Sequence, residues 1–484
     1  MQIEPVHPKY ESFLRDESGL TGRADQIAFP EDTGALAALM SRAAQEELPV
    51  TLQGSRTGLV GGAVPAGGLV INLSRMNAIF DFEEEKDKKL LHAEAGATLE
   101  AINLAAAPQG LSFMPRPTEQ TATAGGMFAT GSSGPNALRY GAGHAHVEAL
   151  LWVTLSGDSW RIKRGEYIFD EAGCALPGGR YLPCKKEWAS FPRAAGLPKK
   201  GRDLIDFLAG SEGKLGAAAE LWLRLLPQPK EHWGVVCFLP DARTLYRFSE
   251  ALLLWHKTPE GRLLSSAEYY DQAALGLLEQ ARAHGSRLNK LPPLPARRAA
   301  VYLELAGDDE SALEAALLES YELFCDAGGD EDETWAVNSR AEVERLQQMG
   351  HAITELFNSA TAAGAGEENL PAARLETDFT GPPEKLEEYL AMYRAGLAQS
   401  GVQGYLYGSL LQNCLHAALL PRSPGEREKC SALALHWGQQ VLRDNGLLIS
   451  KSGTGKLKQG LIRELLPPEA LAAGRTLRDF FAAL

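Results

Sequence analysis

Two glycine-dense stretches, residues 54–65 and 125–143, constrain the possible folds of this chain more than any other feature. Glycine lets backbone N–H groups approach a bound pyrophosphate without obstruction by side chains. One glycine-rich turn would be weak evidence for such a site. Here two of them follow one another, and neither lies in the strand-to-helix turn of a Rossmann fold. The pair therefore predicts a pyrophosphate-binding site built from two loops.

The segments around these loops alternate between helix and strand. Residues 32–47 have the apolar spacing of an amphipathic helix, with Asp32 or Thr33 as its N-cap. Strand-like runs at 49–52 and 69–73 enclose the first loop. The pattern indicates an α+β fold. Further expected elements are strands at 90–95, 147–155, 160–162 and 221–226, helices at 98–109 and 203–208, and an irregular insert at 163–200.

A second domain is expected after the prolines at 227 and 229. Strands at 235–239 and 301–305 there alternate with helices at 243–256 and 310–325. This alternation is typical of a ferredoxin-like α/β cap. At 484 residues the chain is long enough for two or three domains.

The charge of the chain excludes several classes of partner. A net charge of −14 and a pI of about 5.3 do not steer it toward nucleic acid or anionic lipid. No apolar run approaches the ~20 residues of a spanning helix. The polar N-terminal stretch lacks the features of a signal peptide, so we expect a cytoplasmic protein without a transmembrane segment.

The six cysteines show no pairing motif. No CxxC or cluster-binding spacing occurs, so an iron–sulfur centre in this chain is not expected. Cys174 and Cys184 could form a loop disulfide or a loose metal clip. The expected compartment favours the simpler alternative of two reduced thiols.

Three motifs together resemble a known family. The first loop contains Gly54-Ser55-Arg56-Thr57-Gly58. The second stretch combines a P-x-P-T segment at 115–118 with Gly125-Gly126-Met127 and a closing Tyr140-Gly141, and the third motif is Gly-Ser-Glu-Gly-Lys-Leu-Gly at 210–216. Their order and spacing resemble the FAD-linked oxidases of the vanillyl-alcohol-oxidase fold, in the branch of D-lactate dehydrogenase and the FAD subunit of glycolate oxidase.

The resemblance implies a two-lobed FAD-binding domain at 1–226 and a cap at 227–440. It further implies a C-terminal segment, 441–484, that packs back on the FAD domain. No histidine stands in the first loop, where relatives carry a covalent flavin link, so non-covalent FAD is expected. The implied cofactor-binding residues are Gly54, Ser55, Arg56, Thr57, Gly58, Gly61, Gly62, Pro117, Thr118, Gly125, Gly126, Ser133, Tyr140, Glu212 and Gly216.

Arg56 departs from this pattern, because the family often has glycine there. A non-glycine residue at this place requires a strained φ, or its guanidinium pairs with a phosphate. The alternative is that the side chain points to solvent.

The family's C-terminal motifs are degenerate in this chain. The H-x-G-D-G-N-x-H motif falls on residues 409–416, where only His416 is retained. In the later E-H-G-x-G motif, Lys451 and Ser452 replace the glutamate and histidine. A substrate-holding R-H-x-x-P-E segment falls on 350–355 and keeps His351 without its arginine. Because one ligand cannot hold a metal, no metal site is expected.

These changes leave two interpretations of the candidate catalytic residues. Lys451 could place a fixed cation where the metal would be, with His416 or His351 as the base. Alternatively, Lys451 pairs with a neighbouring acid, and His416 is a packed, hydrogen-bonded strand residue.

The sequence thus predicts an FAD-dependent oxidoreductase that oxidises a small hydroxyacid or alcohol, without the family's metal. The alternative is a flavin-binding subunit whose own substrate site has decayed and which serves electron transfer or acts as a scaffold. A third possibility, a sugar or aromatic-alcohol oxidase, differs only in the cap. Expected partners are a small-molecule substrate, an iron–sulfur or electron-transferring flavoprotein subunit, and a second copy of the chain in a homodimer.

Overall fold

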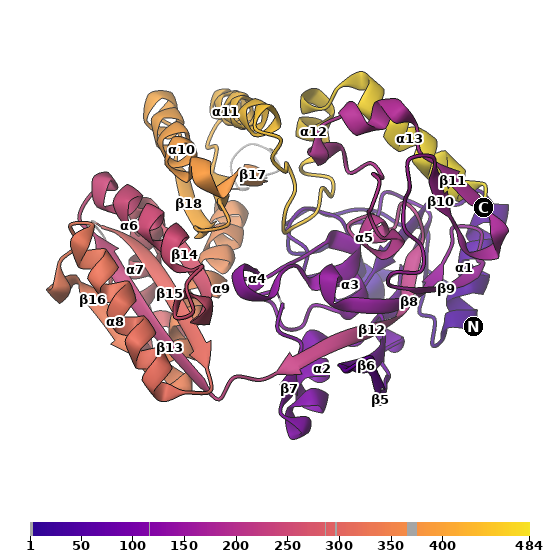
Figure 1. Ribbon diagram of the computed structural model, residues 1–484. Helices are drawn as coiled ribbons and strands as arrows, with labels where there is room; N and C mark the ends of the chain where they lie inside the picture. Colours follow the sequence, from indigo (N-terminus) through magenta and orange to yellow (C-terminus); the bar gives the residue numbers. More distant parts are fainter. Residues whose placement is uncertain (1–2, 116, 286, 296–297, 365–374) are drawn as a thin grey trace. The chain divides into compact units, whose positions relative to one another are not determined.

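The computed structural model describes residues 3–115, 117–285, 287–295, 298–364 and 375–484 (Figure 1). The chain forms two compact units. Unit 1 consists of Met1–Gly134, Ala142–Gln228 and Ser450–Leu484, and unit 2 of Pro135–Gly141 and Pro229–Ile449. Three short ranges differ from the expected domain boundaries, because residues 135–141 and 441–449 belong to unit 2 and residues 227–228 belong to unit 1.

Unit 1 contains two separate sheets, which gives it the expected two-lobed form. The smaller sheet has the order β1-β2-β4-β3, with β1 and β2 antiparallel and the other pairs parallel. The larger sheet has the order β5-β6-β12-β8-β9, is antiparallel throughout, and is extended by β7 beside β12. The insert after β9 carries a small hairpin, β10-β11, that the sequence did not predict.

The strands of unit 1 are β1 (Ile3–Pro5), β2 (Gln26–Ala28), β3 (Val50–Gln53), β4 (Leu69–Asn72), β5 (Ile79–Glu85), β6 (Lys88–Glu94), β7 (Leu111–Ser112), β8 (Val147–Val153), β9 (Ser159–Lys163), β10 (Gly173–Ala175), β11 (Tyr181–Pro183) and β12 (Ala217–Pro227). Its helices are α1 (Thr33–Gln45), α2 (Leu99–Ala106), α3 (Ala124–Thr130), α5 (Leu204–Leu208), α12 (Gln459–Leu465) and α13 (Pro468–Ala482).

Local capping explains where these helices begin. The Asp32 carboxylate accepts a hydrogen bond from the Ala35 N–H, which confirms Asp32 as the N-cap of α1. Thr98 caps α2 in the same way. The helix expected to run to residue 109 ends as an α-helix at Ala106, and a 3-10 turn that contains Pro108 follows it.

Unit 2 is built on one antiparallel sheet of order β16-β13-β15-β14-β18-β19-β17 (Figure 1). The strands β13 to β16 have the ferredoxin-like order that was expected, with the extra helix α7 between β14 and β15. Buried residues of α7 and α9, such as Leu275 and Ile353, form one core with Tyr302 and Tyr407 of the sheet. These two helices therefore cover the face that carries both tyrosines.

The strands of unit 2 are β13 (Glu231–Leu239), β14 (Leu264–Tyr270), β15 (Ala299–Gly307), β16 (Thr334–Val337), β17 (Leu375–Thr380), β18 (Gly404–Ser409) and β19 (Cys414–Leu419). Its helices are α4 (Ala137–Tyr140), α6 (Ala242–Trp255), α7 (Gln272–Ala283), α8 (Glu310–Asp326), α9 (Arg340–Gly364), α10 (Leu386–Ser400) and α11 (Pro424–Arg443). None of the helices in the described ranges is both long and apolar enough to cross a bilayer.

Close packing fixes the second glycine stretch on the larger sheet of unit 1. The Gly125 N–H donates to the Ala95 carbonyl at 2.8 Å. A Cβ at Gly125 would lie 2.6 Å from the Ala95 Cβ. Gly125 is therefore required for the approach of α3 to the end of β6.

We expect Gly125→Ala to destabilise the protein by about 1–3 kcal/mol through overpacking, measured by urea unfolding. Adding Ala95→Gly removes the nearest atom and should recover part of this loss. Gly474→Ala in α13 is the matched control, since no atom lies within 4 Å of the added Cβ, and it should stabilise by up to about 1 kcal/mol. Equal effects of the two glycine substitutions would contradict the packing argument.

Candidate functional site

The first glycine loop, residues 54–65, presents a run of unpaired backbone donors. Within the described residues, the N–H groups of 55–62 donate no hydrogen bond to the protein. Residues 54–59 are half-buried, and Val60 and Gly61 are buried. Buried N–H groups normally have a partner, so such a run is a cradle suited to an anion with several oxygen atoms.

The second loop is held against the first by a glycine. A Cβ at Gly54 would lie 2.2 Å from the Thr123 hydroxyl oxygen, so only glycine fits there. That oxygen also caps α3 by accepting the Gly126 N–H at 3.2 Å. The start of the first loop and the start of α3 are therefore fixed to one another.

The third motif is bonded to the end of α3. The Gly210 N–H donates to the Phe128 carbonyl at 3.0 Å, and the Glu212 N–H donates to the Ala129 carbonyl at 2.8 Å. Glu212 has a left-handed φ of 51°. The three motifs that lie far apart in the sequence thus meet in unit 1.

The Glu212 carboxylate binds the C-terminal segment. Its Oε1 accepts the Thr454 N–H at 2.9 Å and the Gly455 N–H at 2.7 Å. Its Oε2 lies 2.6 Å from Lys214 Nζ, and the Glu212 side chain is only 8% exposed. Both oxygens of this residue, which was expected to approach the flavin, are thus engaged within the protein.

Lys456 connects the same segment to the first loop. Its N–H donates to the Val60 carbonyl at 2.8 Å, and its Nζ donates to the Gly61 carbonyl at 3.4 Å and to the Val64 carbonyl. Burial lowers the pKa of Lys456, while Asp16 and Glu212 act in the opposite direction. The Lys456 ammonium therefore lies at the anion cradle. Lys456 was not among the site residues predicted from the sequence.

Arg56 adopts the strained backbone that its place in the motif required, with a φ of 62°. Its guanidinium lies 4.2 Å from the centroid of the Phe13 ring. Burial lowers the pKa of this guanidinium. The side chain thus stacks on an aromatic ring and is half-buried. Its contact with a phosphate stays a prediction.

The remaining expected cofactor residues divide between the units. In unit 1, the carbonyls of Pro117 and Thr118 accept from Gln120 Nε2 at 2.8 and 3.4 Å. Ser133 follows α3 in the second loop, whose Arg116 lies outside the described residues. Tyr140 belongs to α4 and therefore to unit 2.

Gly216 has a structural requirement of its own. Its φ is 134°, and a Cβ there would lie 2.5 Å from Trp152 Nε1. This glycine lets the start of β12 lie close to β8. Its contact with the cofactor stays a prediction.

In unit 2, His416 is paired with a carboxylate. Its Nδ1 lies 2.8 Å from Glu376 Oε1, and the Tyr407 hydroxyl donates to the same oxygen at 2.8 Å. The Tyr407 and His416 rings stack with centroids 5.0 Å apart. The His416 side chain is 15% exposed and that of Glu376 10%. This pairing orients the imidazole and leaves Nε2 as the atom that can take a proton.

Strand pairing produces the arrangement around His416. Tyr407 of β18 and Asp378 of β17 are both its register partners, so these side chains share one face of the sheet. Glu376 lies two residues before Asp378 and therefore points to the same face. The sequence analysis missed Glu376, Asp378 and Tyr407, because no local signal shows which strands are neighbours.

A second buried carboxylate, Glu304, was also missed. It is 2% exposed. Its Oε2 accepts from Gln347 Nε2 at 2.8 Å and from the Tyr302 hydroxyl at 3.3 Å. His232 Nδ1 lies 3.5 Å from its other oxygen.

The other two candidate catalytic residues are half-buried. His351 lies on α9 in unit 2, and Lys451 lies in the C-terminal part of unit 1. Within the described ranges, no group of three or more His, Cys, Asp or Glu side chains is placed to hold a metal ion. All six cysteines, including Cys174 and Cys184, are free thiols.

Comparison with known proteins matches both units. A family model described as FAD binding domain matches residues 24–163, and one described as FAD linked oxidases, C-terminal domain, matches residues 253–482. D-lactate dehydrogenase of Anaerostipes hadrus is 31% identical over 223 residues, which cover 46% of this chain and 40% of that protein. The chain therefore matches less than half the length of this relative.

Two further comparisons extend over nearly the whole chain. Probable D-lactate dehydrogenase, mitochondrial, of Danio rerio is 26% identical over 468 residues, which cover 96% of this chain and 83% of that protein. A solved structure of alkyldihydroxyacetonephosphate synthase has a TM-score of 0.60 at 12% identity and covers 99% of this chain and 80% of its own. The likeness to this solved structure shows the fold alone.

The glycine loops fall within the FAD-binding model, and the region that contains His416 and Lys451 falls within the oxidase model. The chain therefore belongs to the FAD-linked oxidases of the vanillyl-alcohol-oxidase fold, and its cofactor is FAD.

Proposed function

We propose that this protein is an FAD-dependent oxidoreductase that oxidises the CH–OH group of a small hydroxyacid or alcohol. The observation that carries the proposal is the run of N–H groups at 55–62 that find no acceptor in the described part of the chain. A pyrophosphate offers the oxygen atoms that these donors lack. The names of the relatives place hydroxyacid oxidation first among the reactions to test.

We assign the cofactor to unit 1 and to its loops. The amides of 55–62 would hold the pyrophosphate, with the Lys456 ammonium adding positive charge to the loop. When bound, FAD supplies the acceptor for the hydride of the substrate carbon. The residues of unit 1 proposed to line the rest of the cofactor are Gly54, Pro117, Thr118, Gly125, Gly126, Ser133, Glu212 and Gly216.

His416 is the residue that we propose as the base. Glu376 accepts the Nδ1–H at 2.8 Å, so the lone pair of Nε2 is left to take the proton of the substrate hydroxyl. The carboxylate also stabilises the imidazolium that results. The pairing with Glu376 is the observation on which the choice of His416 rests.

Lys451 is proposed to bind the carboxylate of a hydroxyacid or to stabilise an alkoxide. In this proposal a fixed ammonium replaces the family's metal, and the reaction does not depend on a divalent ion. Electrons would then leave to an iron–sulfur or electron-transferring flavoprotein subunit.

We expect Glu212→Gln to weaken FAD binding by about tenfold. The substitution replaces charge-assisted hydrogen bonds, worth about 1.5–3 kcal/mol, by weaker neutral ones and loosens the C-terminal segment beside the first loop. Equilibrium dialysis of FAD measures the change. Lys214→Gln is the matched control, because Lys214 is 53% exposed and touches only the outer oxygen of Glu212. Equal losses in both variants would overturn the assigned role of Glu212.

The purified protein should be yellow, and one D- or L-2-hydroxyacid or alcohol should bleach its flavin absorbance under anaerobic conditions. A chelator should leave the rate of bleaching unchanged if Lys451 replaces the metal. A chelator that abolishes bleaching would refute the metal-free reaction. A yellow protein that dithionite bleaches but no substrate does would favour the decayed-subunit alternative.

We expect His416→Asn to slow flavin reduction by the identified substrate by about 10²–10⁴-fold, as for loss of a general base. Glu376→Gln should cause a smaller loss, since it removes the charge that orients the ring. Stopped-flow absorbance of the flavin measures both rates. His436→Asn, at an exposed histidine of α11, is the control and should reduce at the wild-type rate.

The same stopped-flow assay also tests the proposed role of Lys451. Lys451→Met should raise the KM for a hydroxyacid by about tenfold or more, because a charged hydrogen bond is lost. Unchanged turnover and KM in Lys451→Met would refute the proposed cation.

A further inference from the structure

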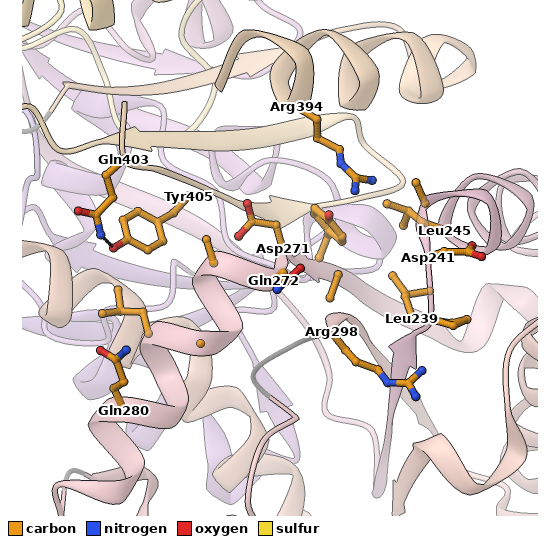
Figure 2. Close-up of a pocket in the computed structure, with 17 residues that line it drawn as sticks. Leu239, Asp241, Leu245, Asp271, Gln272, Gln280, Arg298, Arg394, Gln403 and Tyr405 are labelled. Carbon is orange, nitrogen blue, oxygen red and sulfur yellow. Dashed lines mark hydrogen bonds between the residues drawn. The ribbon is translucent and has the colours of Figure 1, made fainter. Parts of the chain in front are cut away.

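A cavity of about 570 Å³ lies at one end of the sheet of unit 2 (Figure 2). It is formed where β13 and β14 end and β15 and β18 begin, and helices α6, α7 and α10 complete its wall. Sites for small molecules commonly have volumes of 300–1,000 Å³. None of the proposed cofactor or catalytic residues lines it.

A buried tyrosine contributes an unused donor to this cavity. Tyr269 is 1% exposed, and within the described residues its hydroxyl makes no hydrogen bond. Burial raises the pKa of this hydroxyl, and Asp271 and Arg394 are near enough to act on it. The hydroxyl oxygen itself is open to the cavity, so it is available to donate a hydrogen bond to a ligand there.

Arg394 supplies a cation to the same cavity. Figure 2 shows its guanidinium directed from α10 toward the cavity. The described part of the chain offers this exposed guanidinium no ion pair or hydrogen bond. A guanidinium presents two parallel N–H groups that match the two oxygens of a carboxylate.

Two helices, α6 and α7, begin at the cavity with Asp241 and Asp271 as their N-caps. The cap carboxylates offset the partial positive charge of the two helix N-termini, so Arg394 is the group that attracts an anion. Asp271 accepts the Ala274 N–H at 2.7 Å, and burial raises the pKa of its carboxyl to about 6. The side chains of Leu239, Leu245 and Leu277 form an apolar part of the wall.

We propose that this cavity binds a small organic carboxylate, which the Arg394 guanidinium and the Tyr269 hydroxyl hold by its oxygens while its carbon chain packs on the leucines. The residues that line it are not among those proposed to hold the flavin or to act as the base. It would let an organic acid act on the protein without occupying the position of the substrate.

The FAD-loaded protein should bind succinate or acetate saturably in equilibrium dialysis. Arg394→Gln should weaken this binding by about tenfold or more, and Tyr269→Phe should weaken it less. Asp271→Asn keeps a good N-cap but removes a negative charge, so it should bind the acid more tightly than the wild type. Flavin absorbance should not change on binding.

Arg247→Gln is the matched control, because Arg247 is an exposed arginine of α6 outside the cavity. It should bind like the wild type, and all variants should retain their flavin and melting temperature. Equal binding by Arg394→Gln and Arg247→Gln would overturn the proposal. It would also be overturned by inorganic phosphate that binds as tightly as the carboxylates, by an absence of saturable binding, or by binding that perturbs the flavin spectrum and is insensitive to Arg394→Gln.

Discussion

The arrangement of unit 1 depends on the carboxylate of Glu212. Its hydrogen bonds to Thr454 and Gly455 join residues 242 and 243 positions apart. The chain leaves unit 1 after Gln228 and returns at Ser450, so closing this long excursion costs conformational entropy. Charge-assisted bonds from a side chain that is 8% exposed offset part of that cost. The same segment then delivers the Lys456 ammonium to the first loop.

Sheet register has the corresponding role in unit 2. His416 is held between β17 and β18, and its pairing with Asp378 and Tyr407 fixes the face to which the imidazole points. A slip by one residue would turn the ring to the opposite face of the sheet. The position of the proposed base therefore depends on the packing of the whole cap, whose tyrosines fill the core beneath α7 and α9.

Whether a feature could be predicted from the sequence depends on how far apart along the chain its interacting residues lie. The glycine loops, the caps of α1 and α2 and the ferredoxin-like order rest on short-range patterns, and these were predicted. The contact of Gly54 with Thr123 and the bonds of Glu212 to residues 454 and 455 join distant segments, and no local pattern encodes them. Glu376 lies 40 residues from His416 and was missed for the same reason.

Two of the residues that replace family motif residues make side-chain hydrogen bonds of their own. Ser409, at the place of a family histidine, donates to Glu268 Oε1 at 2.7 Å. Ser452, at the place of the second motif's histidine, accepts from Lys458 Nζ at 2.7 Å. Two buried oxygens of the first motif, Gln412 Oε1 and Asn413 Oδ1, lack a hydrogen-bond partner within the described residues, which costs free energy. The paired serines and the Glu376–His416 pair are what a reorganised site would show, whereas these two oxygens are what lost ligands would leave, so reduction of the flavin by a substrate decides between the two.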